Sequence, residues 1–497
     1  MSRSCVIVGA GLGGLATAIR LQSSGWRVTI LEKNAEVGGR CSILRAGDYT
    51  FDMGPTLLLM RDVLDDLFRS AGRRLEDYLE LVRVHPNYRV HFGDGSSIEF
   101  SSDYGRMREQ LDSLEPGAGR AFDRYLADAG YKYHVSRERF VERNFLHWNH
   151  FATPTNLYYL FATNTLRKLS RHAARYFRDP RLIDAFTFQT MYLGLAPSHA
   201  PSVYSLLPYT ELEEGIWFPR GGMYRLPQAL ERLARELGVE IRLNQSVQRI
   251  EIDGAEARGV VLESGEVVRS DAVVANADLP YVYESLLPAR AQSHAHRWRM
   301  DHLNFGSSAF LLYLGLDREY PHLNHHDVFL SADTRENFDA IFRRFELPRN
   351  PSFYLCTPSR TDRTLAPAGG EALYVLVPVP RLSREIDWNK ERAGFRDVIL
   401  GRLEESGLPD IRRHIRYERV YTPQDFVTDY NVARGSAFGI SHTFSQVGYM
   451  RPSNKAPGIA NLFFVGASTQ PGGGIPMVII GSRLTAERME QGVPHVA

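Results

Sequence analysis

The stretch CVIVGAGLGG, residues 5–14, decides the fold of this 497-residue chain. Its first four residues form an apolar run, which is typical of a buried parallel strand. The glycines at positions 9, 11 and 14 follow with the spacing G-x-G-x-x-G. Apolar residues then recur at helical period as far as Gly25, a plausible helix end. The stretch therefore predicts a strand, a tight turn and a helix in direct succession.

Each of these glycines has a separate physical task. Gly9 permits the tight turn, Gly11 lets the backbone approach a pyrophosphate, and Gly14 allows the helix to pack close to the strand. The helix N-terminus offers unpaired N–H groups and a partial positive charge to the phosphates. Residues 28–31 predict the next strand. It ends at Glu32, 18 residues beyond Gly14 (32 − 14), where an acid accepts ribose hydroxyls. These features predict a dinucleotide-binding unit, which serves NAD and FAD alike.

Two loops further along favour FAD over NAD. Gly38-Gly39-Arg40 combines a flexible turn with a guanidinium that can pair with a phosphate. The segment 51–56 (FDMGPT) is a second loop, rich in residues that shape the backbone. Taken alone, the first loop is also compatible with an ordinary turn, and it becomes specific only beside the glycine motif. We therefore expect FAD as the cofactor.

The cofactor fold is predicted to be discontinuous, because strand patterns resume far downstream. They recur at 239–243, 247–252, 260–262, 271–277 and 462–466, and a closing helix is predicted at 478–489. We expect an α/β protein whose Rossmann-type FAD-binding domain comprises residues 1–80, 221–285 and 425–497. An inserted α+β substrate-binding domain is expected at 81–140 and 286–424, with strands at 308–316 and 374–379. A helical region is expected at 141–220.

Composition narrows the classes of partner. The 59 basic and 58 acidic side chains give a net charge of +1, so no global field attracts nucleic acid, and no such partner is expected. The three cysteines, Cys5, Cys41 and Cys356, lie far apart without metal-ligand spacing, which favours a reduced, cytoplasmic protein without a metal. The longest apolar stretches fall short of the roughly 20 residues that a membrane span needs.

These motifs resemble those of the bacterial-type carotenoid desaturases, which comprise the phytoene and the diapophytoene (dehydrosqualene) desaturases. The resemblance runs essentially from end to end and includes the segments 9–14, 38–40, 51–56, 215–223 and 465–476. Segments 51–60, 188–192 and 221–224 look closer to the C30 branch, whereas 471–477 is similar to the terminal oxygenases of C30 carotenoids. The resemblance implies an FAD enzyme that takes hydrogen from a long-chain polyene substrate drawn from a membrane. An electron acceptor such as oxygen or a quinone is expected to complete the reaction.

The motifs and the resemblance together predict the cofactor site. In the family, flavin contacts fall at positions that match Glu32, Arg40, 54–56, Val247 and 466–469. Ser468 stands where amine-oxidase relatives carry an acid, so no ribityl-binding carboxylate is assigned there. The full predicted set is Gly9, Gly11, Gly13, Gly14, Glu32, Lys33, Gly39, Arg40, Gly54, Pro55, Thr56, Val247, Gly466, Ala467, Ile475, Pro476 and Met477.

Desaturation removes a hydride and a proton from neighbouring carbons. The flavin takes the hydride, so the protein has to hold the chain, exclude water and accept the proton. Glu211 and Glu213 are the predicted catalytic residues, with Glu214 beside them, because the resemblance brings this region near the flavin. A solvated turn explains the same three acids. Asp425 is a weaker candidate.

The adjacent histidines His325 and His326 invite a metal or proton-shuttle hypothesis. In a predicted strand they would point to opposite faces, and spaced partners are lacking. We therefore expect a structural role for both, and the sequence predicts no metal site.

The segment 145–177 interleaves aromatic and basic side chains. Trp148, Phe151 and the run 157–161 are followed by Arg167, Lys168, Arg171, His172 and Arg175. Such a pattern suits an interfacial surface whose aromatic residues enter acyl chains while its cations meet headgroups. A buried helix pair with a charged outer face explains the same pattern. We expect a cytoplasmic protein that associates peripherally with a membrane surface.

Three other functions fit the same sequence. The chain could oxidise the terminal methyl groups of a C30 carotenoid, or isomerise a polyene without net oxidation. Prenyl-carrying GDP-dissociation inhibitors resemble this fold and bind lipid without flavin chemistry. The intact motif at 9–14, together with Glu32 and 38–40, argues against such a carrier. Desaturation of a C30 or C40 precursor is the leading hypothesis.

Overall fold

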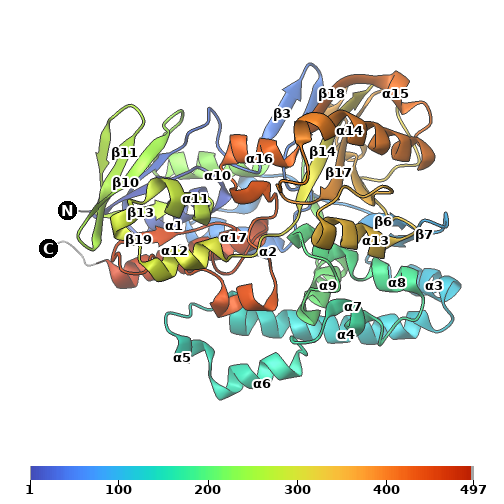
Figure 1. Cartoon of the computed structure of the whole chain (residues 1–497), viewed down its shortest axis with the longest axis horizontal. Helices are drawn as coiled ribbons and strands as arrows, with labels where there is room; N and C mark the ends of the chain where they lie inside the picture. Colours follow the sequence, from blue (N-terminus) through green and yellow to red (C-terminus); the bar gives the residue numbers. More distant parts are fainter. Residues whose placement is uncertain (1, 494–497) are drawn as a thin grey trace.

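The computed structural model describes residues 2–493, which form two lobes above a layer of helices (Figure 1). The first lobe contains a five-stranded parallel sheet of order β19-β13-β1-β2-β9. Its strands are β1 (Ser4–Val8), β2 (Arg27–Leu31), β9 (Glu240–Arg242), β13 (Ala272–Ala275) and β19 (Leu462–Phe464). The sheet thus joins the beginning, the middle and the end of the chain. This arrangement confirms the discontinuous Rossmann-type fold.

Both faces of this sheet are covered, which explains the uninterrupted apolar run in β1. Cys5 and Ile7 pack into a core shared with α1 (Leu12–Ser23), α10 (Arg225–Glu236) and α17 (Ile475–Gly492). Val6 and Val8 point the other way, into a second core. That core lies beneath an antiparallel sheet of β10 (Val247–Asp253), β11 (Glu256–Leu262) and β12 (Val267–Arg269). A strand buried on both faces has no polar side to alternate with its apolar one.

The closing helix is longer than the predicted 478–489. It begins three residues earlier, at Ile475, directly after Gly474, whose φ of 102° lies outside the helical range. Pro476 occupies the first turn, where the missing N–H has no intrahelical partner to lose.

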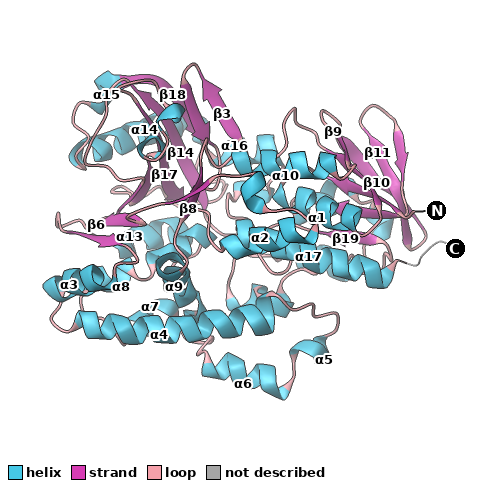
Figure 2. Ribbon diagram, turned by 180° about the vertical axis from the view of Figure 1, so that it is seen from behind, coloured by secondary structure: helices cyan, strands magenta, loops and turns pink. Residues whose placement is uncertain are grey.

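The second lobe is a seven-stranded sheet of order β18-β14-β17-β16-β15-β6-β7. The predicted strand 308–316 is confirmed as β14, and 374–379 lies within β17. α14 (Trp388–Glu405) packs on the outer face of this sheet through Phe395 and Ile399 (Figure 2). The strands are β6 (Tyr88–His91), β7 (Ser97–Phe100), β14 (Ser308–Leu316), β15 (His326–Phe329), β16 (Phe353–Cys356), β17 (Glu371–Val379) and β18 (Ile415–Tyr421).

The helical layer lies below both lobes in Figure 1. It contains α3 (Tyr104–Leu114), α4 (Ala118–Ser136), α5 (Trp148–Phe151), α6 (Pro154–Ala162), α7 (Leu169–Ala173), α8 (Pro180–Ala185) and α9 (Leu206–Glu213). Within residues 2–493, no helix combines the length and the apolar character that a membrane span requires.

Shorter elements connect these layers. The strands are β3 (Ile43–Ala46), β4 (Tyr49–Asp52), β5 (Leu81–Arg83) and β8 (Trp217–Pro219). The helices are α2 (Arg61–Ser70), α11 (Leu279–Tyr281), α12 (His294–Asp301), α13 (Thr334–Asp339), α15 (Ile411–His414) and α16 (Pro423–Tyr430).

Candidate active site

A cavity of about 770 Å³ extends from the parallel sheet of the first lobe to the helical layer. One end is lined by Gly11 and Glu32, at the carboxyl ends of β1 and β2. The other end is lined by Phe151 of α5 and Leu160 of α6. Its volume lies within the range of small-molecule sites, and its lining is mainly apolar. The cavity therefore connects two parts. We call the part around Gly9–Gly13 and Glu32 the dinucleotide cradle, and the apolar part that reaches Phe151 and Leu160 the channel.

The cradle fits a phosphate group. Gly11 is the N-cap of α1 and makes no side-chain cap hydrogen bond, so the first N–H groups of this 12-residue helix face the cavity without a side-chain acceptor. A Cβ on Gly11 would lie 2.8 Å from Asn276 Nδ2, so the close backbone approach requires glycine. Gly14 has another task, because its Cβ would lie 2.3 Å from the carbonyl oxygen of Gly9, and it is not among the cavity-lining residues.

Glu32 is buried at the end of β2 and lines the same cavity. Its Oε2 accepts a 2.7 Å hydrogen bond from the N–H of Ala10, and its Oε1 accepts one of 3.0 Å from Asn34. These two amides orient the carboxylate. A carboxylate oxygen has a second lone pair, so acceptor capacity remains for a ribose hydroxyl.

Sixteen of the predicted cofactor residues line this one cavity. They are Gly9, Gly11, Gly13, Glu32, Lys33, Gly39, Arg40, Gly54, Pro55, Thr56, Val247, Gly466, Ala467, Ile475, Pro476 and Met477. Arg40 donates a 3.2 Å hydrogen bond from Nη1 to the carbonyl of Ala437, which holds its guanidinium at the wall.

Sequence reasoning missed one residue of the cradle, Asn276, and one residue that supports it from behind, Arg451. Asn276 follows β13 and donates from Nδ2 to the carbonyl of Gly9 at 3.3 Å. Asn276 could have been predicted from its position, because it follows the carboxyl end of a strand beside β1, where ligands bind in such folds. Arg451 is fully buried and donates to the carbonyls of Ala467 at 2.5 Å and Thr469 at 3.1 Å. It thereby fixes the turn after β19, and burial lowers the pKa of its guanidinium to about 10.

Glu211 lies directly behind the cavity wall. It is fully buried in α9, and its Oε2 accepts a 2.7 Å hydrogen bond from the phenol of Tyr88. Burial raises the pKa of Glu211 to about 8, and the nearby phenols of Tyr88 and Tyr192 partly oppose this rise. Tyr192 lines the cavity, whereas Glu211 itself does not. Tyr192 falls in the segment 188–192 that carries the resemblance, but the sequence assigned no role to either tyrosine.

The other candidate bases occupy different surroundings. Glu213 is exposed, accepts a hydrogen bond from Tyr104, and is not brought to the cavity. Glu214 accepts a 2.5 Å hydrogen bond from Tyr133, a cavity residue, and burial raises the pKa of its carboxyl. Asp425 closes the capping box of α16 with Thr422, which explains the acid at this position.

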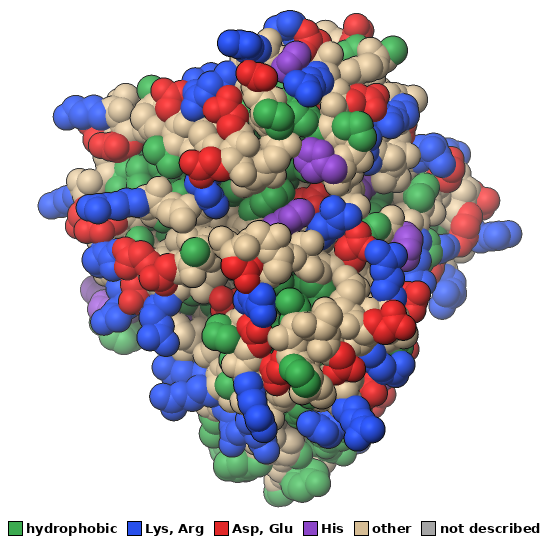
Figure 3. Space-filling view, turned by 90° about the vertical axis from the view of Figure 1, so that its right-hand side faces the viewer, with side chains coloured by type: hydrophobic (Ala, Val, Ile, Leu, Met, Phe, Trp, Pro, Cys, Tyr) green, Lys and Arg blue, Asp and Glu red, His purple; other side chains and the backbone are tan. Residues whose placement is uncertain are grey.

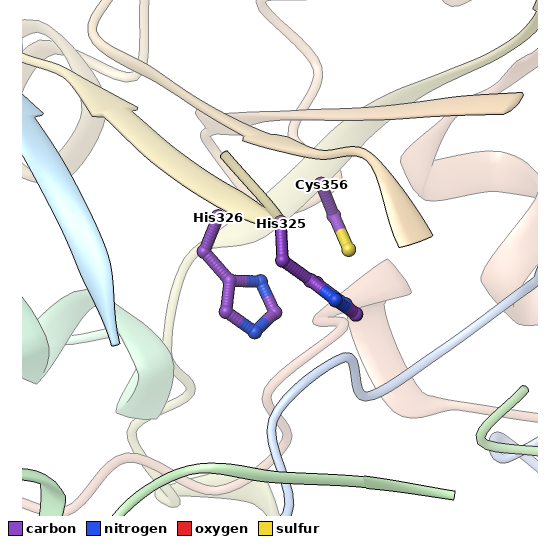
Figure 4. A group of neighbouring side chains, drawn as sticks. All are labelled: His325, His326 and Cys356. Carbon is purple, nitrogen blue, oxygen red and sulfur yellow. The ribbon is translucent and has the colours of Figure 1, made fainter. Parts of the chain in front are cut away.

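His325 and His326 do not point to opposite faces, so that expectation was wrong. Their ring centroids lie 4.2 Å apart (Figure 4). The alternation of a strand applies only within it, and β15 begins at His326, which leaves the side chain of His325 free to turn back. Both rings are buried, and burial lowers the pKa of His325 to about 3.

The segment 145–177 is not a buried helix pair. Trp148 on α5 is 68% exposed, and Phe161 on α6 is 70% exposed. Hydrophobic side chains cover the lower tip of the molecule, with Lys and Arg side chains above them (Figure 3). The exposed members of this group are Leu146, Trp148, Leu157, Tyr158, Phe161 and Leu166, with the exposed cations Arg167, Lys168, Arg171 and Arg175. His172 does not belong to this surface, because it is buried against Asp128 and Lys132.

Comparisons with known proteins agree with this geometry. The sequence profile described as flavin containing amine oxidoreductase matches residues 12–489. A zeta-carotene-forming phytoene desaturase from Myxococcus xanthus is 48% identical over 98% of this chain and 94% of its own length. A 4,4'-diapophytoene desaturase from Staphylococcus haemolyticus is 38% identical, over 98% of this chain and 99% of its own length.

A solved structure has the same fold. An oxidoreductase from Methanosarcina mazei superposes with a TM-score of 0.67 at 19% identity, covering 97% of this chain and 100% of that one. The family profile and the two desaturase relatives, together with the intact glycine motif at Gly9–Gly14, favour a flavin enzyme over a lipid carrier of the same fold. The chain belongs to the flavin-containing amine oxidoreductases and, within them, to the carotenoid desaturases, which are FAD-dependent oxidoreductases that act on CH–CH bonds.

Proposed function

We propose that this enzyme desaturates a linear polyene precursor of carotenoids, and that C40 phytoene is its preferred substrate. The main support for this proposal is the cavity, because it joins the cofactor cradle to an apolar channel lined by aromatic side chains. The relatives include desaturases of both chain lengths, and the higher of the two reported identities, 48%, belongs to a phytoene desaturase. This identity favours C40 over the C30 preference drawn from short sequence segments.

Different parts of the cavity have different roles in the proposed reaction. The flavin, when bound against the glycines of residues 9–14 and the loops 38–40 and 54–56, supplies the hydride acceptor. Tyr354 and Tyr374, both on the inner face of the second sheet, line the channel and exclude water from the reacting carbons.

We assign proton removal to Glu211, acting through Tyr192. Once the hydride has left, the polyene carries positive charge, so the neighbouring C–H is acidic and a weak base suffices. Tyr192 at the wall takes this proton on its oxygen while its own proton passes to Glu211. A pKa of about 8 leaves part of the carboxyl ionised at neutral pH. Glu213 has no part in this scheme, because it lies outside the cavity.

We further propose that the exposed aromatic residues of α5 and α6 dock on a membrane surface. Trp148 and Phe161 would enter the acyl layer, while Arg167, Lys168 and Arg171 meet anionic headgroups. Leu160 of α6 lines the end of the cavity that lies away from the cofactor cradle, so we propose that a substrate leaving the membrane enters the cavity here. Within the predicted helical region 141–220, we propose α5 and α6 with the basic segment 167–175 as the docking region. Oxygen or a quinone is proposed to reoxidise the flavin.

Product analysis tests the proposed reaction. The flavin-loaded enzyme is incubated with phytoene or diapophytoene in lipid vesicles, and products are identified by absorbance and mass. A loss of two hydrogens per step with a lengthening chromophore supports desaturation, and faster turnover of phytoene supports the C40 assignment. Gain of oxygen, or a product of unchanged mass, contradicts desaturation and points to an oxygenase or an isomerase.

A further inference from the structure

Three potential metal ligands gather behind the wall of the second sheet. His325, His326 and Cys356 each offer one ligand atom, and these atoms lie within 4.8 Å of one another. Figure 4 shows the two imidazoles and the thiol close together at the ends of β15 and β16. All three side chains are buried. The sequence concealed this group, because Cys356 lies 30 residues beyond His326 (356 − 326) and forms no ligand-spacing pattern with it.

Strand pairing explains why two of the three meet. His326 and Cys356 are direct partners in the antiparallel β15–β16 ladder, so their side chains share one face of the sheet. His325 precedes the strand, and its carbonyl accepts a 2.8 Å hydrogen bond from the N–H of Thr357. The backbone thus holds all three residues at neighbouring positions, where β15 begins and β16 ends.

Both imidazoles are oriented as metal ligands are. His325 Nδ1 lies 2.5 Å from Thr361 Oγ1, and His326 Nδ1 lies 2.7 Å from the phenol oxygen of Tyr354. When Nδ1–H donates to these hydroxyl oxygens, Nε2 carries the lone pair on each ring. In the part of the chain that the structure describes, both Nε2 atoms are buried and have no hydrogen-bond partner. Two such nitrogens beside a thiol are costly to bury unless something binds them.

We propose that His325, His326 and Cys356 form a binding site for a soft d10 cation, Zn²⁺ or Cu⁺. Imidazole nitrogen and thiolate sulfur are the ligands that these ions select, and the absence of carboxylate from the trio disfavours Mg²⁺ and Ca²⁺. Zinc bonds of about 2.0 Å to nitrogen and 2.3 Å to sulfur require ligand atoms roughly 3.5 Å apart. The ligand atoms lie within 4.8 Å of one another, so cation binding requires the three side chains to move closer together where they exceed the separation that zinc requires. A cavity of about 10 Å³ borders Cys356, a volume at the lower limit for one water molecule.

The site has a structural task in this position. Cation binding fixes the ring of His326, which holds the phenol of Tyr354, and this phenol lies 2.7 Å from Thr56 Oγ1. Thr56 and Tyr354 both line the main cavity. The cation would therefore stiffen the contact between the second sheet and the loop 54–56 without touching the reacting carbons.

Metal binding to the flavin-loaded enzyme tests the proposal. Tag-free protein is stripped with a chelator and then titrated with Zn²⁺, or anaerobically with Cu⁺, against a competing chelator that keeps surface histidines unoccupied. We expect one ion per chain and a rise in the melting temperature on binding. Co²⁺ serves as a spectroscopic probe, because a sulfur ligand gives it an intense charge-transfer absorption.

Matched variants separate this site from adventitious binding. Cys356→Ala should weaken binding at least tenfold and abolish the cobalt–thiolate absorption. Cys5→Ala, another buried cysteine far from the trio, should change neither. Thr361→Val removes the partner of His325 Nδ1 and should weaken binding about 10- to 100-fold, as loss of such outer contacts does. Unchanged flavin content in each variant shows that it has folded.

Two results overturn the proposal. One is that neither Zn²⁺ nor Cu⁺ binds near one ion per chain under competition. The other is that binding of equal affinity survives in Cys356→Ala. Neither outcome affects the proposed desaturation, which is measured by product analysis and does not depend on this site.

Discussion

The phenol of Tyr88 donates a 2.7 Å hydrogen bond to Glu211, although the two residues lie 123 positions apart and on different elements, β6 and α9. Gln189 Nε2 donates in turn to the oxygen of Tyr88 at 3.0 Å. This buried polar group stands behind Tyr192 at the cavity wall. The carboxyl therefore has oriented partners and little solvent, which are the conditions that perturb a titration.

The pH dependence of turnover tests Glu211 as the base. Only the ionised form accepts a proton, so with a pKa of about 8 the wild-type rate should rise with pH and level off above 8. Glu211→Gln should lower the rate roughly 10²- to 10⁴-fold and remove this rise. Glu213→Gln is the control, because that carboxylate is exposed and outside the cavity. A wild-type profile in the Glu211→Gln enzyme would remove Glu211 from the mechanism.

Tyr192→Phe tests the connection between cavity and base. The change deletes one oxygen, so the fold and the flavin content should be retained while the proton path is interrupted. We expect a lower kcat with little change in KM, because the residue acts on the chemical step. Measurement uses initial rates on vesicle-borne phytoene. Equal loss of flavin and of activity would indicate a structural role instead.

The same carboxyl should make folding stability depend on pH. In the unfolded chain Glu211 ionises near 4.5, whereas in the folded protein burial raises its pKa to about 8. Between these values the folded state binds the extra proton, so stability is fully present below 4.5 and falls as pH rises toward 8. The difference in melting temperature between wild type and Glu211→Gln should shift in favour of the variant over this range. A constant difference from pH 5 to pH 8 contradicts the assigned pKa.

Substitution of Gly11 should reduce flavin binding, whereas substitution of Gly14 should reduce folding stability. Gly11→Val places a side chain at the backbone position that the glycine motif reserves for a pyrophosphate, where its Cβ meets only the Asn276 side chain, so the variant should fold but lose most of its bound flavin. Gly14→Ala forces a Cβ against the carbonyl of Gly9, so it should lower stability itself. Flavin absorbance and far-ultraviolet circular dichroism distinguish the two results. Gly394→Ala is the control, since a Cβ there meets open space in α14. Full flavin retention in Gly11→Val would contradict the assignment of residues 9–14 as the phosphate-binding site.

Membrane docking predicts a defect that is confined to vesicle binding. The double variant Trp148→Ser, Phe161→Ser should weaken binding to anionic vesicles at least tenfold, because each buried aromatic side chain contributes about 1.5–3 kcal/mol. Co-sedimentation measures the bound fraction, and flavin content should not change. Trp298→Ser on α12 is the matched control, a tryptophan that is 62% exposed outside the docking region. If both proteins bind equally well, α5 and α6 are not the docking surface.

The cradle was predictable because its signals are local. The strand at 5–8, the turn at Gly9 and the acid Glu32 follow one another within 28 residues (32 − 4), and each has a backbone or spacing requirement that the sequence displays. Family resemblance extended this to distant positions such as Val247 and Gly466, which line the same cavity.

The pair of histidines was misjudged for an equally physical reason. Alternation of side chains predicts opposite faces only when both residues belong to the strand, and the start of β15 at His326 is decided by its pairing with Cys356. Asp425, in contrast, has a local explanation. Thr422 lies three residues earlier, and this spacing is typical of a capping box.

The sequence by itself determined that this protein folds around a dinucleotide, because glycine spacing, apolar runs and a terminal acid act over a few neighbouring residues. Only the tertiary structure decided which carboxyl is buried behind the channel and which polar side chains surround it. Glu211 and Glu213 are two residues apart in one short helix, and packing against β6 buries the first and leaves the second in solvent. Burial and charge depend on neighbours from distant segments, and no local pattern encodes them.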